Sequence, residues 1–148
     1  MRINSVPLKV LLDTGASRSC VSEKFVTRLR LSPLPLDSDQ PETLCTADNS
    51  KMHVLGQVEL SVQINGLTIM HDFIVLPSLF HDCLLGADLL VKSQACMDLH
   101  NRYVSFYDGL VAVPLLPLDS SDNILRLTHS LRIPPASEAL AAVSINRK

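Results

Sequence analysis

Short apolar runs broken by turn residues make up most of the chain, and their dominant period is two. This alternation is typical of β-strands that bury one face. Leu8 to Leu12 is the first run, and Cys83 to Leu85 is a later one that ends at Gly86. The Asn65-Gly66 pair lies between alternating apolar positions and predicts a tight hairpin. The pattern therefore predicts an all-β fold.

Three further segments carry recognisable local patterns. Residues 19–30 have apolar side chains at helical spacing behind serines that could cap a helix. We expect either a short helix there or a strand followed by one turn. Ala87 to Ser93 predicts a short helix, and Cys96 to Leu99 is expected to pair with Tyr103 to Tyr107 in a hairpin.

A second hairpin is expected in the middle of the chain. Residues 42–47 and 51–60 would form its arms, around a turn at residues 47–50. The arms carry few large apolar side chains near the tip, so little burial would hold the tip against the core. We therefore expect this hairpin to project from the domain and to move.

The sequence changes character after Gly109. Prolines punctuate residues 110–148, whereas residues 1–109 hold the regular apolar runs. Proline fits poorly inside a sheet because it cannot donate to the hydrogen-bond ladder. We therefore expect one domain at 1–109, followed at 110–148 by a partly ordered linker and the start of a downstream segment, with two more short strands around Pro134-Pro135.

Composition narrows the classes of function. The chain has 148 residues, 47% hydrophobic and 19% charged, which suits one folded domain rather than a disordered chain. Its net charge of -2 and scattered basic residues argue against nucleic acid or an anionic membrane as a partner. No apolar stretch approaches the ~20 residues that span a bilayer, and no signal peptide is visible, so we expect a cytoplasmic protein.

Cysteines and histidines give no sign of a metal or cofactor. The 4 cysteines lack a C-x-x-C pair, and none of the 5 histidines lies four residues from another. A zinc site or a disulfide framework is therefore not predicted, and we expect the cysteines to be buried, reduced thiols.

The candidate chemistry lies in Asp13-Thr14-Gly15, directly after the first apolar run. A carboxylate at the end of a buried strand is costly unless it is hydrogen-bonded, paired or functional. The Thr14 hydroxyl can bond nearby backbone, Gly15 permits a turn or a close approach, and Ala16 is small enough to let another group pack above it. Taken alone, the tripeptide fits a satisfied turn aspartate as well as a catalytic one.

A wider combination of motifs separates these two interpretations. The stretch LLDTGASRSCVS, followed about 70 residues later by CLLGADLL, resembles the retropepsin-like aspartic proteases, most closely those of gypsy-type retrotransposon polyproteins. The resemblance covers about residues 6–108. It implies a closed β-barrel or sandwich protomer with a flap hairpin and one short helix. Residues 110–148 in turn resemble the segment that follows the protease in such polyproteins.

The resemblance also implies roles for particular residues. Asp13 matches the catalytic aspartate, Thr14 the residue whose hydroxyl links two catalytic loops, and Gly15 the residue that receives the substrate backbone. A second group supports this loop: Leu84, Leu85 and Gly86 would cross behind it, and we predict an ion pair between Arg18 and Asp88. The implied substrate-binding residues are Ala16, the flap tip Thr46, Ala47, Asp48, Asn49 and Ser50, and the loop residues Leu79 and Phe80.

A single Asp-Thr-Gly has a further consequence. Peptide hydrolysis by this chemistry needs two carboxylates that share one proton, and the chain contains one such motif. The resemblance therefore implies a homodimer, assembled partly through the terminal strands Cys96 to Leu99 and Tyr103 to Tyr107, that cleaves a polyprotein. The alternative is a catalytically silent retropepsin-like module, derived from a retroelement, that dimerises or binds peptides.

Overall fold

The computed structural model describes residues 1–36, 43–45, 51–116, 125–127 and 143–145. The chain divides into two compact units, Met1–Leu115 and Leu116–Lys148. In the second unit two short strands, β13 (Leu125–Leu127) and β14 (Val143–Ile145), pair antiparallel. The first unit is mostly β-structure, as the sequence predicts, and carries the candidate site.

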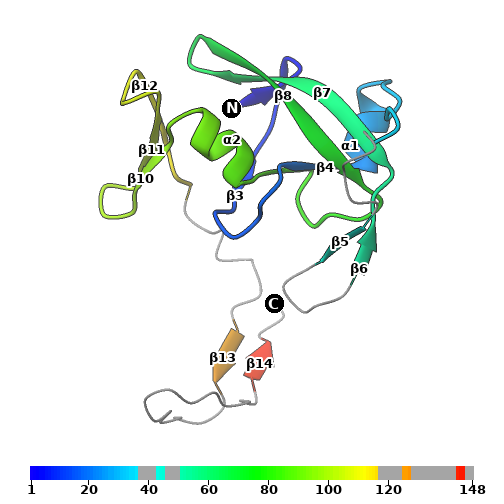
Figure 1. The fold of residues 1–148 in the computed structure, drawn as a ribbon. Helices are drawn as coiled ribbons and strands as arrows, with labels where there is room; N and C mark the ends of the chain where they lie inside the picture. The colour runs from blue at the N-terminus through cyan, green and yellow to red at the C-terminus, as the bar shows by residue number, and fades with distance from the viewer. Residues whose placement is uncertain (37–42, 46–50, 117–124, 128–142, 146–148) are drawn as a thin grey trace. The chain divides into compact units, whose positions relative to one another are not determined.

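A seven-stranded sheet forms the body of the first unit (Figure 1). Its order, β2-β1-β7-β8-β4-β9-β3, places segments from both ends of the unit side by side. Most neighbours pair antiparallel, but β3 runs parallel to β9 and β4 runs parallel to β8. The strands are β1 (Arg2–Ile3), β2 (Val6–Pro7), β3 (Leu11–Leu12), β4 (Cys20–Ser22), β7 (Gly56–Ile64), β8 (Leu67–Leu76) and β9 (Cys83–Leu85).

The long hairpin of β7 and β8 is the centre of this sheet. Its strands pair from Gly56 with Val75 to Ile64 with Leu67, and Asn65-Gly66 makes the turn between them. Both turn residues have positive φ, 44° and 90°, which is the geometry that favours Asn-Gly. The predicted hairpin is therefore confirmed, and alternate residues of β7 enter the core.

Two smaller sheets flank the large one. The strands β5 (Thr43–Cys45) and β6 (Lys51–His53) pair antiparallel and form arms of the predicted flap hairpin. The second arm is shorter than the predicted 51–60, because the chain from Gly56 on belongs to β7 and pairs with β8. The predicted flap tip, residues 46–50, lies outside the described residues. The other sheet is a meander of β10 (Cys96–Asp98), β11 (Tyr103–Phe106) and β12 (Val111–Pro114), beside α2 in Figure 1.

The meander extends further than the sequence suggests. The hairpin of β10 and β11 is the predicted one, but β12 comes from the proline-punctuated stretch. Pro114 is tolerated because β12 is the edge strand of its sheet and Pro114 is its last residue.

Two short helices are present in the described residues, α1 (Glu23–Arg28) and α2 (Ala87–Lys92), whereas the resemblance implied one. The Ser22 hydroxyl accepts a hydrogen bond from Phe25 N at 3.1 Å and so caps α1. The segment 19–30 thus contains a strand followed directly by a helix. Neither helix, and no other described helix, is long and apolar enough to cross a membrane.

The core lies between the large sheet, the helices and the meander. It is built on three fully buried aromatic rings, Phe25 from α1, Phe73 from β8 and Phe106 from β11. The thiols of Cys20 and Cys83 are buried and free, but Cys96 is exposed because β10 is an outer strand, so the expectation of buried cysteines is wrong there.

The tightest backbone crossing in this fold gives a first prediction. A Cβ at Gly86 would lie 2.6 Å from both the carbonyl carbon and oxygen of Arg18 and 2.9 Å from Ala16 O. Backbone cannot yield as a flexible side chain would, so Gly86→Ala should lower the free energy of unfolding in urea by about 3 kcal/mol.

Gly66→Ala is the matched control for that measurement. A Cβ at Gly66 meets nothing within 4 Å, and only the positive φ is strained, at a cost of about 1 kcal/mol. If Gly86→Ala costs no more than Gly66→Ala, the crossing is not as tight as the geometry indicates.

Candidate active site

The loop that follows β3 is held in shape by hydrogen bonds from its backbone N–H groups. Asp13 N donates to Leu85 O at 3.0 Å, which continues the pairing of β3 with β9 into the loop. Gly15 N then donates to Asp13 Oδ1 at 2.9 Å, and Ala16 N donates to Asp13 O at 3.3 Å. A Cβ on Gly15 would lie 3.3 Å from Asp13 Oδ1, so a side chain at this position would crowd the Asp13 carboxylate.

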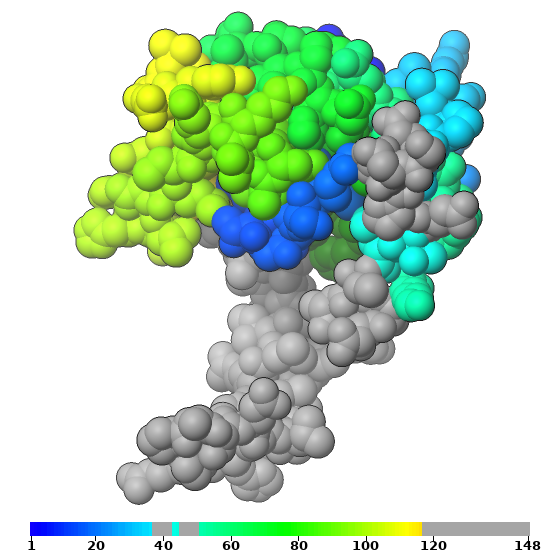
Figure 2. Space-filling view, in the orientation of Figure 1, coloured from blue at the N-terminus to red at the C-terminus, as the bar shows by residue number. Residues whose placement is uncertain are grey.

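The loop lies at the surface of the unit, as Figure 2 shows for the blue segment between β3 and β4. Asp13 and Ala16 are half-buried, while Thr14 and Gly15 are exposed. The sequence suggested a buried strand leading to Asp13. Only its last two residues form a strand, and Leu11 is 38% exposed because β3 is the edge of the sheet.

Gly86 crosses directly beside this loop, as the sequence predicts for the Leu84-Leu85-Gly86 stretch. Gly86 N donates to Ser19 Oγ at 3.0 Å, and Ala87 N donates to Ala16 O at 2.8 Å. These two bonds join the end of β9 and the start of α2 to both ends of the loop after Asp13.

The Asp88 carboxylate makes several polar contacts behind the loop. Its Oδ1 accepts from Ser19 Oγ at 2.6 Å and from Leu89 N at 2.7 Å. Its Oδ2 accepts from Ser19 N at 2.9 Å. Arg18 Nε lies 3.5 Å from Asp88 Oδ2. His71, which is on β8, places its Nε2 3.1 Å from the same oxygen. The Arg18 contact is the one that the sequence predicts; Ser19 and His71 are additional.

This environment keeps the Asp88 carboxyl ionised. Burial works to raise the pKa of Asp88, but the His71 contact and the hydrogen bonds from Ser19 and Leu89 outweigh burial and hold the pKa far below its usual range. The neighbouring Cys20 thiol behaves in the opposite way: burial, assisted by the Asp88 charge, raises its pKa to about 11. A neutral thiol is a poor nucleophile, so Cys20 is not a candidate for nucleophilic chemistry here.

The loop after β8 is fixed at its far end. Asp82 Oδ2 lies 3.0 Å from Arg28 Nη2, and Asp82 Oδ1 accepts from the Ser22 hydroxyl at 3.2 Å. Ser22 N also donates to Asp82 O at 3.0 Å, so this end of the loop is tied to the start of α1. Of the two residues predicted to line a substrate cleft, Leu79 is half-buried and Phe80 is 91% exposed.

A second, small apolar cluster lies next to this loop. Its buried members are Cys20, Val54, Ile74 and Leu76. The residues packed against it are only partly buried and come from β5, β6, β9 and two loops, including the 77–82 loop: Leu36, Leu44, Met52, Leu79 and Leu84. The cluster is therefore an apolar surface left partly open beneath the described flap strands.

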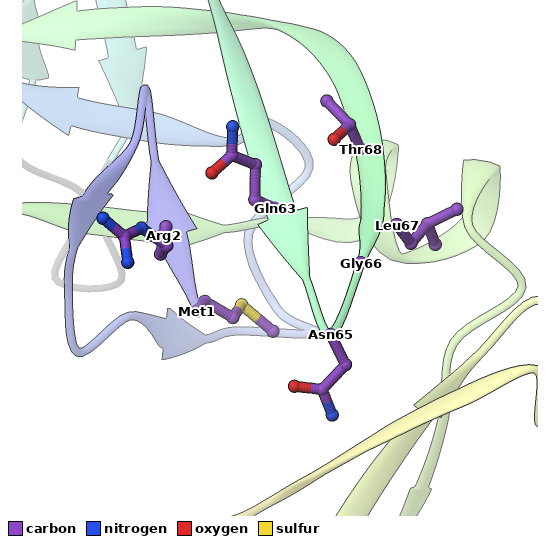
Figure 3. A pocket seen from close by; sticks show the side chains of 7 residues that line it. All are labelled: Met1, Arg2, Gln63, Asn65, Gly66, Leu67 and Thr68. Atoms are coloured by element: carbon purple, nitrogen blue, oxygen red, sulfur yellow. The ribbon is translucent and has the colours of Figure 1, made fainter.

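Two of the pockets in the described part of the chain bear on where the candidate site lies. One, of about 300 Å³, is largely apolar and includes Thr14 of the candidate loop with Leu90 and Val91 of α2 and Met97 of β10. The other, of about 360 Å³, lies at the turn between β7 and β8 (Figure 3). It contains none of the predicted site residues. Among the described residues no group of three His, Cys, Asp or Glu side chains could hold a metal ion.

The lowered pKa of Asp88 predicts how stability depends on pH. A depressed folded-state pKa adds stability above the unfolded value of about 3.9 and loses it as pH falls toward the folded value. Asp88→Asn should therefore lower the free energy of unfolding by about 2 kcal/mol at pH 7, and this difference from wild type should shrink below pH 4. Urea unfolding at pH 7, 5 and 3 measures it.

Asp72→Asn serves as the control for this series, because Asp72 is exposed and faces Glu59 across the hairpin. It should leave stability almost unchanged at each pH. A deficit in Asp88→Asn that stays constant from pH 7 to pH 3 would show that the charge of Asp88 does not stabilise the fold.

Comparison with known proteins finds relatives over most of the chain. Protein DNA-DAMAGE INDUCIBLE 1 of Arabidopsis thaliana is 30% identical over 135 residues, which is 90% of this chain and 31% of that protein. DNA damage-inducible protein 1 of Kluyveromyces lactis is 29% identical over 143 residues, 96% of this chain and 33% of that protein. The chain thus spans about a third of the length of these curated relatives.

A solved structure shares the fold. The retroviral protease-like domain of Ddi1 from Leishmania major superposes with a TM-score of 0.61 at 24% identity, covering 80% of this chain and 92% of that domain. This similarity supports the predicted retropepsin-like architecture of the sheet.

A family model matches the segment that contains the candidate site. The model is described as "gag-polyprotein putative aspartyl protease", and it matches residues 1–92. That range holds the Asp13 loop, the Gly86 crossing and both described helices. The predicted resemblance to retropepsin-like proteases is confirmed, while a particular closeness to gypsy-type elements stays a prediction. The chain belongs to the gag-polyprotein aspartyl protease family and has a retropepsin-like fold.

Proposed function

We propose that the protein is an aspartic endopeptidase that acts as a homodimer, with Asp13 of each copy facing the other. One observation carries the proposal. The Asp13 loop is fixed from behind by Gly86 and Asp88, yet its front, at Thr14 and Gly15, is exposed in the single chain. A second copy bringing its own Asp13 would complete a pair of carboxylates there.

The chemistry of such a pair follows from its shared proton. Two carboxylates at contact distance cannot both be ionised, so the pair holds one proton. The ionised Asp13 takes a proton from water as the water oxygen attacks the peptide carbonyl carbon. The protonated Asp13 donates its proton to the carbonyl oxygen. When the C–N bond breaks, the Asp13 that took the proton from water passes it to the leaving nitrogen, which departs as an amine. The other Asp13 takes a proton from a hydroxyl of the tetrahedral intermediate as the new carboxyl group forms, so the pair again holds one proton.

The apolar pocket beside Thr14 supports dimerisation at this face. Val91 is 76% exposed at its rim, and Leu11 is 38% exposed on the neighbouring edge strand. In the predicted terminal strands, Leu99 and Tyr103 are also exposed, at 77% and 38%. Exposed apolar groups next to the loop, such as Val91 and Leu11, suit an isologous interface, in which each surface meets its own copy.

The substrate is proposed to be a polypeptide with apolar side chains near the scissile bond. The partly open cluster that includes Leu44, Met52, Leu79 and Leu84 would receive them. We place Phe80 and the predicted flap tip, residues 46–50, over the same cleft. A polyprotein is the proposed natural substrate, because the matching family is that of gag polyproteins.

A silent peptide-binding module is the second candidate. The observation that favours it is that the apolar cluster exists in the single chain, without a second copy. Such a protein would bind extended apolar peptides and cut none of them. Asp13 is the residue that distinguishes the two functions.

Replacement of Asp13 tests the catalytic role. Asp13→Asn keeps the size of the side chain but removes the shared proton, so cleavage of a denatured polypeptide at mildly acidic pH should fall at least about 100-fold. A pepstatin-type inhibitor should block the wild type in the same assay. Equal cleavage by both proteins would remove Asp13 from the mechanism, and cleavage by neither, with retained peptide binding, would favour the silent module.

Disruption of the Val91 surface tests the dimer. Because Val91 is exposed in the single chain, Val91→Glu should spare folding but weaken self-association at least about tenfold, since it places two like charges at a desolvated interface. Sedimentation equilibrium gives the dissociation constant, and specific activity should fall with it. Leu34→Glu, on another exposed apolar residue, is the control. Unchanged association in Val91→Glu would exclude this face as the interface.

A further inference from the structure

His71 is the only contact of the Asp88 carboxylate, among the described ones, that comes from the central hairpin. Its side chain is 10% exposed, and its ring meets the ring of Phe73 edge-on at 5.4 Å. Phe73 is fully buried in the core. The imidazole thus packs against a core side chain while its Nε2 lies 3.1 Å from Asp88 Oδ2.

We propose that His71 is a positioning residue for the Asp13 loop: through Asp88 it fixes Ser19, and with Ser19 the far end of the loop, to strand β8. The consequence for catalysis rests on the proposed function, but the fixing of the loop does not. Nothing in the retropepsin-like motifs of this sequence marks His71.

The contacts form a continuous path. His71 Nε2 lies 3.1 Å from Asp88 Oδ2, and the same oxygen accepts from Ser19 N at 2.9 Å. The other oxygen accepts from Ser19 Oγ, which in turn accepts from Gly86 N. Strand β8 also reaches Ser19 directly, because Ile74 N donates to Ser19 O at 3.0 Å. Ser19 is therefore held to β8 from two sides.

Arg18 cannot supply the same restraint. Its Nε lies 3.5 Å from Asp88 Oδ2, but Arg18 belongs to the loop and moves with it, and its side chain is 31% exposed. A group anchors the loop only if it stands on a different, rigid element. His71 meets that condition, since β8 is paired with β7 from Leu67 to Val75.

His71 contacts the Asp88 carboxylate through its Nε2, which lies close to Asp88 Oδ2. The two atoms are at ion-pair distance, although the ring N–H is not well aimed at the oxygen. The other charged groups nearby are Arg18 on the loop and Lys92 on α2, whose Nζ bonds Met70 O at 3.0 Å. The Cys20 thiol on β4 is neutral. Asp88 is thus the anionic partner that the described surroundings of His71 provide.

Substitution by an aromatic ring without nitrogen separates positioning from packing. His71→Phe keeps a ring against Phe73 but removes Nε2, whereas His71→Gln keeps a polar nitrogen of similar reach. Amide hydrogen exchange followed by NMR reads the loop directly, through Ser19 N–H and Ala87 N–H. In His71→Phe both should exchange at least about tenfold faster, while amides of the β7–β8 ladder keep their rates.

The rescue and control variants complete the exchange experiment. His71→Gln should return both amides to within about threefold of wild type, and Asp72→Asn, on the opposite face of β8, should change nothing. Unchanged exchange at Ser19 and Ala87 in His71→Phe would overturn the inference. A uniform acceleration through β7 and β8 would also overturn it, because it would show that His71 only supports the sheet.

Cleavage kinetics provide the second arm. If the wild type cleaves peptide, His71→Phe should lower kcat about tenfold with little change in KM, because small displacements of a reacting group reduce rate more than binding. An unchanged kcat would overturn the catalytic consequence. If the wild type cleaves nothing while the exchange pattern appears as expected, the proposed function fails and the positioning of the loop by His71 stands.

Discussion

The crossing of two backbones at Gly86 is the constraint on which the candidate site depends. A side chain at this position would meet carbonyl groups of Arg18 and Ala16 at less than 3 Å. Because none is present, Ala87 N can reach Ala16 O and Gly86 N can reach Ser19 Oγ. The end of β9 thereby fixes the path of a loop that is exposed at its tip and has no regular structure of its own.

The partly buried carboxylate of Asp88 holds the loop behind that crossing. Burial alone would favour a neutral Asp88, yet its two oxygens receive hydrogen bonds from Ser19 and Leu89 and face Arg18 and His71. A charge in a partly buried site is tolerated when the fold already orders its hydrogen-bond donors. Any arrangement that moves those donors away then costs free energy. The loop, α2 and β8 are consequently held in one arrangement, which suits a site that must place a carboxylate accurately.

Most of the correct predictions from the sequence came from short motifs whose structure depends on their own residues. Asn65-Gly66 specifies a turn by its own backbone preferences, and Gly86 after two leucines marks a strand end in the same way. The contacts of Ser19 and His71 could not be obtained like this, since Ser19 meets Asp88 across 69 positions of sequence. One signal was present: His71 lies in phase with the inward-facing Ile69 and Phe73, where a polar side chain requires a partner.

The exposure of Leu11 shows why patterns of apolar residues overstate burial at a sheet edge. A run of apolar residues predicts that a strand is covered, but it does not say by which molecule. Here β3 is the last strand of its sheet, so one chain leaves Leu11 and the front of the Asp13 loop uncovered. The same residues that looked buried in the sequence are therefore consistent with burial by a second copy. The fold of one chain therefore fixes the Asp13 loop from behind and leaves its front, at Thr14 and Gly15, open.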